Sequence, residues 1–341
     1  MARETDPVTR APAAADRRLP SAADARRRGE GRRRTQGSVS DRRERRTALA
    51  FISPWLVGFS VFTAWPILYS AYLSLTDYDV INDPRFVGLE NYQRMAEDPQ
   101  VRLALWNTLQ YTLVQVPLYV VVALALALLL NAAATAGAGR WFGIFRTAFF
   151  IPKMTPPVAV GVLLLLLFNG SYGLVNQVLA TVGIDGPSWT TDPSWIKPGL
   201  ALVSLWGVGS AVVILLAALQ EVPAELYDAA KVDGAGWWRR TRTVTLPMIS
   251  GGIFFVTVIN TIAAFQLFDE AYSAFFGAGT SAYANDDALF YVIYLFREGF
   301  GELHMGYAAA LAWLLFVVIM IVTAVQLAVS RRLVYYEGEQ R

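Results

Sequence analysis

The chain has 341 residues, of which 55% are hydrophobic and 16% are charged, and its formal net charge at pH 7 is +2. Soluble domains carry about 25% charged residues, so this composition disfavours a soluble domain and predicts an integral membrane protein. The chain has no cysteine and one histidine, His304, so disulfides and thiolate metal sites are excluded, and histidine-based catalysis or metal binding has almost nothing to use.

The first segment, residues 1–47, is rich in arginine and contains the basic blocks ARRRGEGRRR and DRRERR. Few of its residues could build a core, so we predict a disordered cytoplasmic tail whose charge helps to set the topology. Contact with anionic lipid headgroups is the alternative. Nucleic-acid binding is not expected, because the tail has no aromatic residues for stacking on bases. The segment is too long for a signal peptide, and no A-x-A cleavage site follows the apolar run after it.

Six apolar runs follow, each long enough for a membrane-crossing helix of roughly 20 residues. Pro117 lies in the second run, and Pro152, Pro156 and Pro157 lie in the third. Such prolines indicate kinked helices in a bundle, because neighbouring helices must satisfy the carbonyl groups that proline leaves free. The predicted fold is an all-α integral membrane protein with about six transmembrane helices within residues 48–332. The predicted spans are Ala48–Leu75, Leu109–Asn131, Ile144–Phe168, Pro198–Leu219, Ile249–Phe268 and Tyr307–Ser330.

Lysine and arginine gather in alternate loops. The tail, the loop with Arg140, the loop with Lys231 and the C-terminal segment after Arg331 are basic, whereas the loops with Asp185 and Asp286 are mixed or acidic. Positive loops stay in the cytoplasm, so both termini are predicted to be cytoplasmic. Residues 333–341 are then a short cytoplasmic C-terminal tail.

The loop between the fourth and fifth spans, residues 221–247, is polar and basic and contains PAELYDAAKVDGAGWWRRTRTVTLP. Its first part has a helical pattern in which the small residues Ala229 and Ala230 leave a shallow surface that another backbone could approach closely. Gly234 stands where a helix C-cap would place it. A second short helix is predicted over Trp237–Arg242. The loop should therefore form a helix-turn-helix on the cytoplasmic face.

The spacing of this loop resembles the EAA signature of the permease subunits of ABC importers. That signature reads E-A-A, three residues, G, nine residues, I, one residue, L-P; this chain has D-A-A, G, V and L-P in the same register, and Thr241 where relatives usually have an aromatic residue. In this family the EAA helices dock into clefts on the ATP-binding subunits. The resemblance implies an ATPase-coupling role for Asp228, Ala229, Ala230, Gly234, Leu246 and Pro247.

The resemblance extends over most of the chain. FVGLENYQRM, LWNTLQYT, FRTAFFIPKMTPPVAVGVL and GLVNQVL look like the carbohydrate-uptake branch, whose permeases serve maltose, lactose and glycerol-phosphate systems. The ending RRLVYYEGEQR lacks the GAVKG-like terminus of one subunit type and is similar to the other, MalF-like type, with a MetI-type fold. The stretch FGAGTSAYANDD, Phe276–Asp287, replaces the usual Gly-Gly-Pro turn, which leaves the shape of that extracytoplasmic loop open.

The resemblance implies a permease subunit of a binding-protein-dependent importer for a sugar or oligosaccharide in the bacterial inner (plasma) membrane. Its expected partners are a second permease subunit in a heterodimer, a dimer of ATPase subunits, an extracytoplasmic solute-binding protein and membrane lipid, but no nucleic acid. No cofactor and no enzymatic activity are expected, because the chain has no G-x-x-x-x-G-K-[ST] phosphate loop and ATP must be bound by the partner.

Three other functions were weighed. An ion-gradient-driven secondary transporter would show an ionisable relay within the spans or a repeat of broken helices, and neither is clear here. A membrane-embedded enzyme lacks catalytic candidates. An ABC permease for a non-sugar solute such as glycerol phosphate remains open.

Polar side chains within spans are costly and mark transport pathways. The candidates are Gln115, Lys153, Ser204, Ser210, Asn260, Thr261 and Gln266. In the resembled family the helices that flank the EAA loop line the path, and an aromatic face suits a sugar ring, so the predicted substrate-binding residues are Ser204, Trp206, Asn260 and Gln266. The alternatives are that Asn260 or Thr261 only bonds to a neighbouring helix, that Trp206 packs in the core, and that Lys153 reaches the headgroups.

Overall fold

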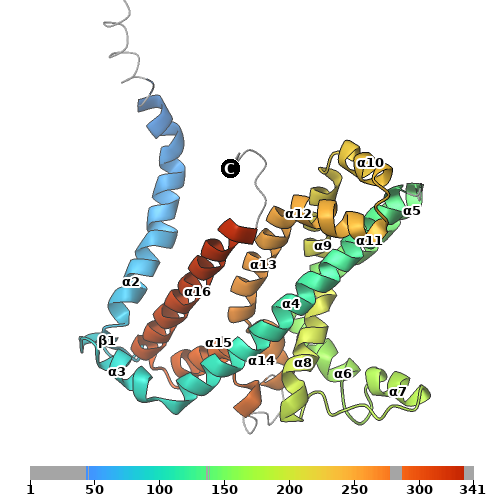
Figure 1. Cartoon of the computed structure of the whole chain (residues 1–341). Coiled ribbons are helices and arrows are strands. Elements are labelled where there is room, and N and C mark those ends of the chain that lie inside the picture. Colours follow the sequence, from blue (N-terminus) through green and yellow to red (C-terminus); the bar gives the residue numbers. More distant parts are fainter. Residues whose placement is uncertain (1–43, 45, 136, 138, 277–285, 334–341) are drawn as a thin grey trace, which may run out of the picture. The chain divides into compact units, whose positions relative to one another are not determined.

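The computed structural model describes residues 44, 46–135, 137, 139–276 and 286–333 (Figure 1). The predicted N-terminal tail, the C-terminal tail and most of the Phe276–Asp287 loop lie outside these residues, apart from a few positions at their borders. The chain separates into two units, Met1–Leu68 and Tyr69–Arg341.

The described part of the first unit is helical and forms most of the first predicted span. The apolar helix Arg46–Leu73 is long enough to cross a membrane and ends in α2 (Trp65–Leu73). A π-helical turn, η1 (Ser60–Ala64), precedes α2, and the Trp65 N–H donates to the Ser60 carbonyl. Pro66 follows directly, and because proline cannot donate the usual bond, the ladder shifts by one residue just before it.

The second unit begins with a short antiparallel hairpin of β1 (Thr76–Asp77) and β2 (Arg85–Phe86), followed by α3 (Glu90–Glu97) and the 37-residue α4 (Pro99–Thr135), which continues through Pro117. The other α-helices are α5 (Gly139–Phe150), α6 (Pro157–Leu167), α7 (Leu174–Thr181), α8 (Pro193–Ser204), α9 (Gly209–Gln220), α10 (Ala224–Val232), α11 (Trp237–Arg240), α12 (Leu246–Met248), α13 (Ser250–Phe265), α14 (Asp269–Phe275), α15 (Tyr291–Phe296) and α16 (Met305–Leu333). Single turns of other helix types are η2 (Ile151–Met154), η3 (Leu205–Gly207), η4 (Thr241–Thr245), η6 (Asp286–Ala288) and η7 (Arg297–Gly301).

The predicted all-α membrane fold with about six spans is confirmed. Four continuous helical segments of the described chain are long and apolar enough to cross a membrane, and two bent helix pairs raise the number to six if each pair forms one span. The pair α5–η2 and α6 bends by 97°, and the pair α8–η3 and α9 bends by 57°. The prolines of the third predicted span lie at the first of these bends, where they remove backbone donors.

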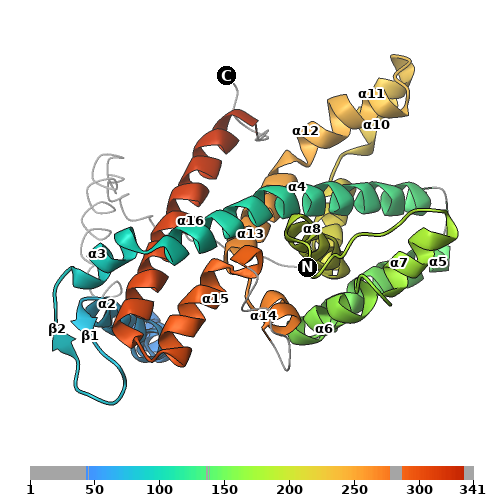
Figure 2. The ribbon, with the colours of Figure 1, turned by 90° about the horizontal axis from the view of Figure 1, so that it is seen from below.

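Helix α4 lies at the centre of the second unit, where it packs against α8, α9, α13 and α15 (Figures 1 and 2). One buried cluster of side chains, including Leu200, Phe265 and Tyr291, lies around the first half of α4, and another, including Val212 and Ile249, lies around its second half. Helices α6 and α14 pack closely at Gly161, where an added Cβ would clash with the Glu270 carbonyl oxygen. Small residues permit such close backbone packing in membrane helices.

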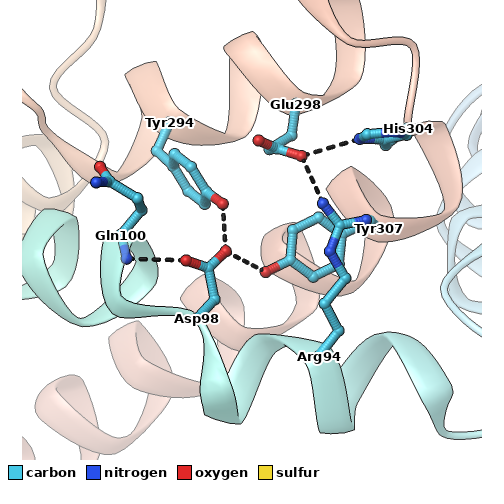
Figure 3. A network of polar contacts seen from close by, with 7 residues as sticks. All are labelled: Arg94, Asp98, Gln100, Tyr294, Glu298, His304 and Tyr307. Carbon is cyan, nitrogen blue, oxygen red and sulfur yellow. Dashed lines mark hydrogen bonds and ion pairs between the residues drawn. The ribbon is translucent and has the colours of Figure 1, made fainter.

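A polar network joins the α3–α4 corner to α15, η7 and α16, about 200 residues away in sequence (Figure 3). Tyr294 and Tyr307 donate hydrogen bonds to one Asp98 oxygen, the latter at 2.8 Å, and the Gln100 N–H donates to the other at 2.8 Å. Partial burial raises the pKa of Asp98, but these hydrogen bonds outweigh it and hold the pKa below its usual value. Burial, together with the bond to Asp98, raises the pKa of Tyr294 far above its usual value.

An ion pair extends the same network. The Arg94 guanidinium donates to the buried Glu298 carboxylate at 3.1 Å, and its carbon lies 4.0 Å from the centroid of the Tyr307 ring. His304 Nδ1 lies 3.0 Å from the same Glu298 oxygen. Because Glu298 is buried, its negative charge needs these partners. The single histidine of the chain thus has a structural contact.

Candidate functional site

A cavity among the described residues lies where three helices are interrupted. Its volume is about 440 Å³, and its wall includes residues from the turn between α5 and α6, the turn between α8 and α9, and the break between α13 and α14. Interrupted backbone at membrane depth is tolerated where it is buried in protein or lines a cavity. The free backbone groups at such breaks, with nearby side chains, can bind a polar solute inside the membrane.

All four predicted substrate-binding residues line this cavity: Ser204, Trp206, Asn260 and Gln266. Trp206 is 44% exposed, so the alternative that it packs in the core is not supported, and its Nε1 lies 3.3 Å from the Thr155 hydroxyl. An indole face at the wall of a polar cavity can stack on the apolar face of a sugar ring.

Two of these residues are held by a chain of hydrogen bonds through Gln115 on α4. The Asn260 amide donates to the Gln115 oxygen at 3.1 Å, and the Gln115 amide donates to the Ser204 hydroxyl at 3.1 Å. Ser204 in turn donates to the Ala201 carbonyl at 2.7 Å. Asn260 therefore does bond to a neighbouring helix, as the alternative stated, but it also faces the cavity. The network fixes the orientation of its polar groups.

Thr261 and Lys153 differ in their relation to the cavity. Thr261 is buried, accepts a hydrogen bond from Gln326 at 2.9 Å and is absent from the cavity wall. Lys153, by contrast, lines the cavity, where an aliphatic carbon of its side chain lies 3.8 Å from the position that a Cβ on Gly207 would take. The alternative that Lys153 reaches the headgroups stays a prediction.

Sequence reasoning missed the residues that follow the α13–α14 break. Asp269 and Glu270 begin α14 and line the cavity, whereas the charge pattern had assigned them only to a loop outside the membrane. The signal available in the sequence was an acidic pair directly after the predicted substrate residue Gln266. Tyr119, which donates to the Gly207 carbonyl at 2.9 Å, was also missed.

The second candidate site is the polar loop after α9. Pro223 is the N-cap of α10, and the helix begins at Ala224. At the other end, the Ala235 N–H donates to the Ala230 carbonyl at 2.9 Å and the Gly234 N–H donates to the Lys231 carbonyl at 3.0 Å. These two bonds form a Schellman motif, and Gly234 has the positive φ of 71° that this motif needs.

The predicted helix Trp237–Arg242 differs from the structure. Helix α11 ends at Arg240, and the π-helical η4 and then α12 follow without a turn. The Leu246 N–H donates to the Thr241 carbonyl, one residue further back than in an α-helix, immediately before Pro247. As before Pro66, the missing proline donor accounts for the shift.

The residues of the coupling prediction differ in exposure. Asp228, Ala229 and Gly234 are exposed, and Asp228 pairs with Lys231 at 2.8 Å on the surface of α10. Leu246 and Pro247 are half-buried in α12, at the start of the fifth span. The turn after α10 is therefore exposed, and α11, η4 and α12 connect it to α13.

Large apolar side chains remain exposed beside this turn. Val232 is 89% exposed and Trp238 is 76% exposed. A depression of about 380 Å³ lies between the end of α4 and the helices α10 and α11, with Tyr227 and Arg240 in its wall. Exposed apolar groups next to a depression are typical of protein–protein contact surfaces.

Comparison with known proteins places these features in context. The family model for the binding-protein-dependent transport system inner membrane component matches residues 123–335. The Bacillus subtilis (strain 168) protein named "Probable ABC transporter permease protein YesP" is 36% identical over 92% of this chain and 99% of the relative. The lactose transport system permease protein LacF of Rhizobium radiobacter is 35% identical over 82% of this chain and 93% of the relative.

The fold also matches solved structures. A chain in the crystal structure of a bacterial ABC transporter involved in the import of the acidic polysaccharide alginate superposes with a TM-score of 0.71 at 23% identity, covering 87% of this chain and 99% of that chain. A second alginate transporter structure, in complex with alginate pentasaccharide-bound periplasmic protein, also gives 0.71, at 22% identity, with 86% and 96% covered. At this level of identity the likeness concerns the fold.

Proposed function

The chain belongs to the family of inner membrane components of binding-protein-dependent transport systems, and on that premise we propose that it forms half of the translocation path of an importer for an uncharged or charged sugar or oligosaccharide. It is a membrane-embedded transport subunit and not an enzyme. Family membership excludes the ion-gradient-driven alternative. Relatives named for lactose, arabinooligosaccharides and trehalose/maltose support a sugar over glycerol phosphate as the solute.

The observation that carries this proposal is the cavity at the three helix breaks. Its lining combines an exposed indole with amide and hydroxyl groups, which is the chemistry that a sugar ring and its hydroxyls require. Binding sites of this kind offer an apolar surface with a few placed polar groups. Ser204, Trp206, Asn260 and Gln266 are the proposed contacts.

The loop after α9 is the proposed contact between this chain and the ATPase. Its residues Asp228, Ala229, Ala230 and Gly234 would dock on an ATP-binding subunit, and Leu246 and Pro247 would pass the movement to α13. A rigid connection of this type is what long-range coupling between two sites needs. ATP would be bound by the ATPase dimer alone, so the chain itself needs no cofactor.

The remaining partners follow from the same proposal. A second permease subunit would supply the other half of the path, and an extracytoplasmic solute-binding protein would deliver the solute. The alternation of basic loops supports an orientation in the inner membrane with both termini and Lys231 in the cytoplasm.

The test is reconstitution of this chain with its second permease subunit, ATPase subunits and binding protein in liposomes. Uptake of the sugar retained by the purified binding protein should depend on ATP. Trp206→Ala should lower uptake by about 3- to 10-fold through lost stacking, whereas Trp106→Ala, an exposed tryptophan outside the cavity, should leave it unchanged. ATP-independent uptake, or equal effects of the two substitutions, would contradict the proposed function or the proposed site, respectively.

A further inference from the structure

The cavity contains charged groups that a neutral sugar path does not obviously need. Among the described residues, its ionisable acid and base side chains are one positive, Lys153, and two negative, Asp269 and Glu270, a net formal charge of −1. A charged side chain in a membrane interior costs roughly 2.5–3.5 kcal/mol on insertion scales. Such groups are retained where they act on a solute or an ion.

The backbone holds both ends of this charge arrangement in place. Lys153 lies in η2, at the 97° bend between α5 and α6. Glu270 lies in the first turn of α14, and its carbonyl oxygen packs so closely on Gly161 of α6 that no Cβ could fit between them. Lys153 is therefore connected to α6 through the chain, and Glu270 is held against α6 by packing.

Within the part of the chain that the structure describes, neither charge is neutralised by a close partner. The ion pairs found within 4.0 Å among the described residues do not include Lys153 or Glu270, although the two interact electrostatically at longer range. An ammonium group with three donors and a carboxylate with free acceptor sites can both bond to sugar hydroxyls. A solute carrying its own negative charge would meet one attractive and two repulsive groups.

We propose that Lys153 and Glu270 select the solute by charge, so that the path admits an uncharged polyhydroxylated solute and disfavours an anionic one. This inference rests on the proposed function, because it assigns a substrate class to the same cavity. Lys153 partly offsets the two carboxylates and donates to solute hydroxyls. Glu270, with Asp269, supplies the repulsion.

The absence of cysteine allows a direct measurement of the charge selectivity. Ala263 lines the cavity, is exposed and is small, so Ala263→Cys places one thiol there. In the assembled importer, this thiol is treated with two methanethiosulfonates of similar size, the anionic sulfonatoethyl and the cationic trimethylammonioethyl reagent. Modification is read by mass on this chain, so cysteines of the partner subunits do not contribute.

Each rate is divided by the rate of the same reagent with a free thiol in solution. On this scale the cationic reagent should react faster than the anionic one. Adding Glu270→Gln should raise the anionic-to-cationic rate ratio by about two- to fivefold, and adding Lys153→Gln should lower it by a similar factor, the size expected for one charge near contact distance in a wet site. Lys153→Arg, which keeps the charge, and Arg242→Gln, which removes an exposed charge outside the cavity, should leave the ratio unchanged.

Ratios unaffected by both Glu270→Gln and Lys153→Gln would overturn the inference, since the charges would then face lipid headgroups or solvent instead of the path. A thiol that reacts with neither reagent would also overturn it, because the cavity would then be closed to solutes. The measurement needs no transport. Loss of ATP-dependent uptake with an intact charge response would refute the proposed function, whereas normal uptake with no charge response would refute only the selectivity.

Discussion

Gly234 offers a sharp test of the proposed contact with the ATPase, because the structure separates backbone strain from steric clash at this position. Its φ is +71°, and an added Cβ would have no atom within 4 Å. A side chain at this site therefore costs only the left-handed backbone conformation, about 1–2 kcal/mol for an ordinary residue. The cost should be higher for a β-branched residue and lower for asparagine, which adopts this conformation more readily.

A cost of 1–2 kcal/mol reduces the population of the native turn by about 5- to 30-fold. Gly234→Val should therefore weaken both the recovery of the ATPase with the permease and ATP hydrolysis stimulated by the loaded binding protein, while Gly234→Asn should stay near wild type. Insertion should be normal for both variants, because no spanning segment changes. The assays are pull-down of the ATPase and stimulated hydrolysis in liposomes.

The relative effects of Gly234→Val and Gly234→Asn distinguish the possible explanations. Equal defects in Gly234→Val and Gly234→Asn would show that any side chain at this position blocks docking. The defect would then come from the contact surface and not from the backbone conformation. Wild-type behaviour of both would show that this turn is not the coupling element, and the role proposed for the loop would lose its main support.

Two further predictions concern topology and the polar network. Single cysteines at Asp185 and Asp286 should react with an impermeant external maleimide and one at Lys231 should not, and external labelling at Lys231 would reverse the proposed orientation. Asp98→Asn should lower the thermal unfolding midpoint in detergent above about pH 5. Because the pKa of Asp98 is lowered in the fold, the stability that its carboxylate contributes is present above the unfolded pKa and is lost as the pH falls through the folded pKa. The gap between Asp98→Asn and wild type should thus begin to narrow below about pH 4 and close as the pH falls through the lowered folded pKa, and a gap that is constant down to about pH 3 would contradict the role given to this carboxylate.

Local features of the chain were predictable because local interactions decide them. A helix in lipid satisfies its own backbone groups, so hydropathy alone located six spans. The turn at Gly234 depends on hydrogen bonds within six residues, Ala230 to Ala235, and the D-G pair indicated it. The same reasoning placed the bend of the third span at its prolines.

The π-helical turns were not predictable with the same rules. Of the three π-helical turns among the described residues, η1 and η4 each end two residues before a proline, whereas η7 does not, and Pro117 lies in an uninterrupted α4. Whether a helix absorbs a proline, bends or shifts its hydrogen bonds depends on which neighbouring groups can satisfy the freed carbonyl. That information is tertiary.

By itself the sequence determined the membrane class, the number of spans, the family and the residues of the polar loop, because each of these is written in hydropathy, charge or spacing along a continuous stretch. Only the tertiary structure decided that Gln115 links Asn260 to Ser204 and that Lys153 and Glu270 line the same cavity. It also decided that the α3–α4 corner is hydrogen-bonded to α15 and α16. These contacts join residues from about 90 to 210 positions apart. Hydropathy predicts that a segment crosses the membrane but not how it is rotated or where it breaks, and those two properties set which side chains meet.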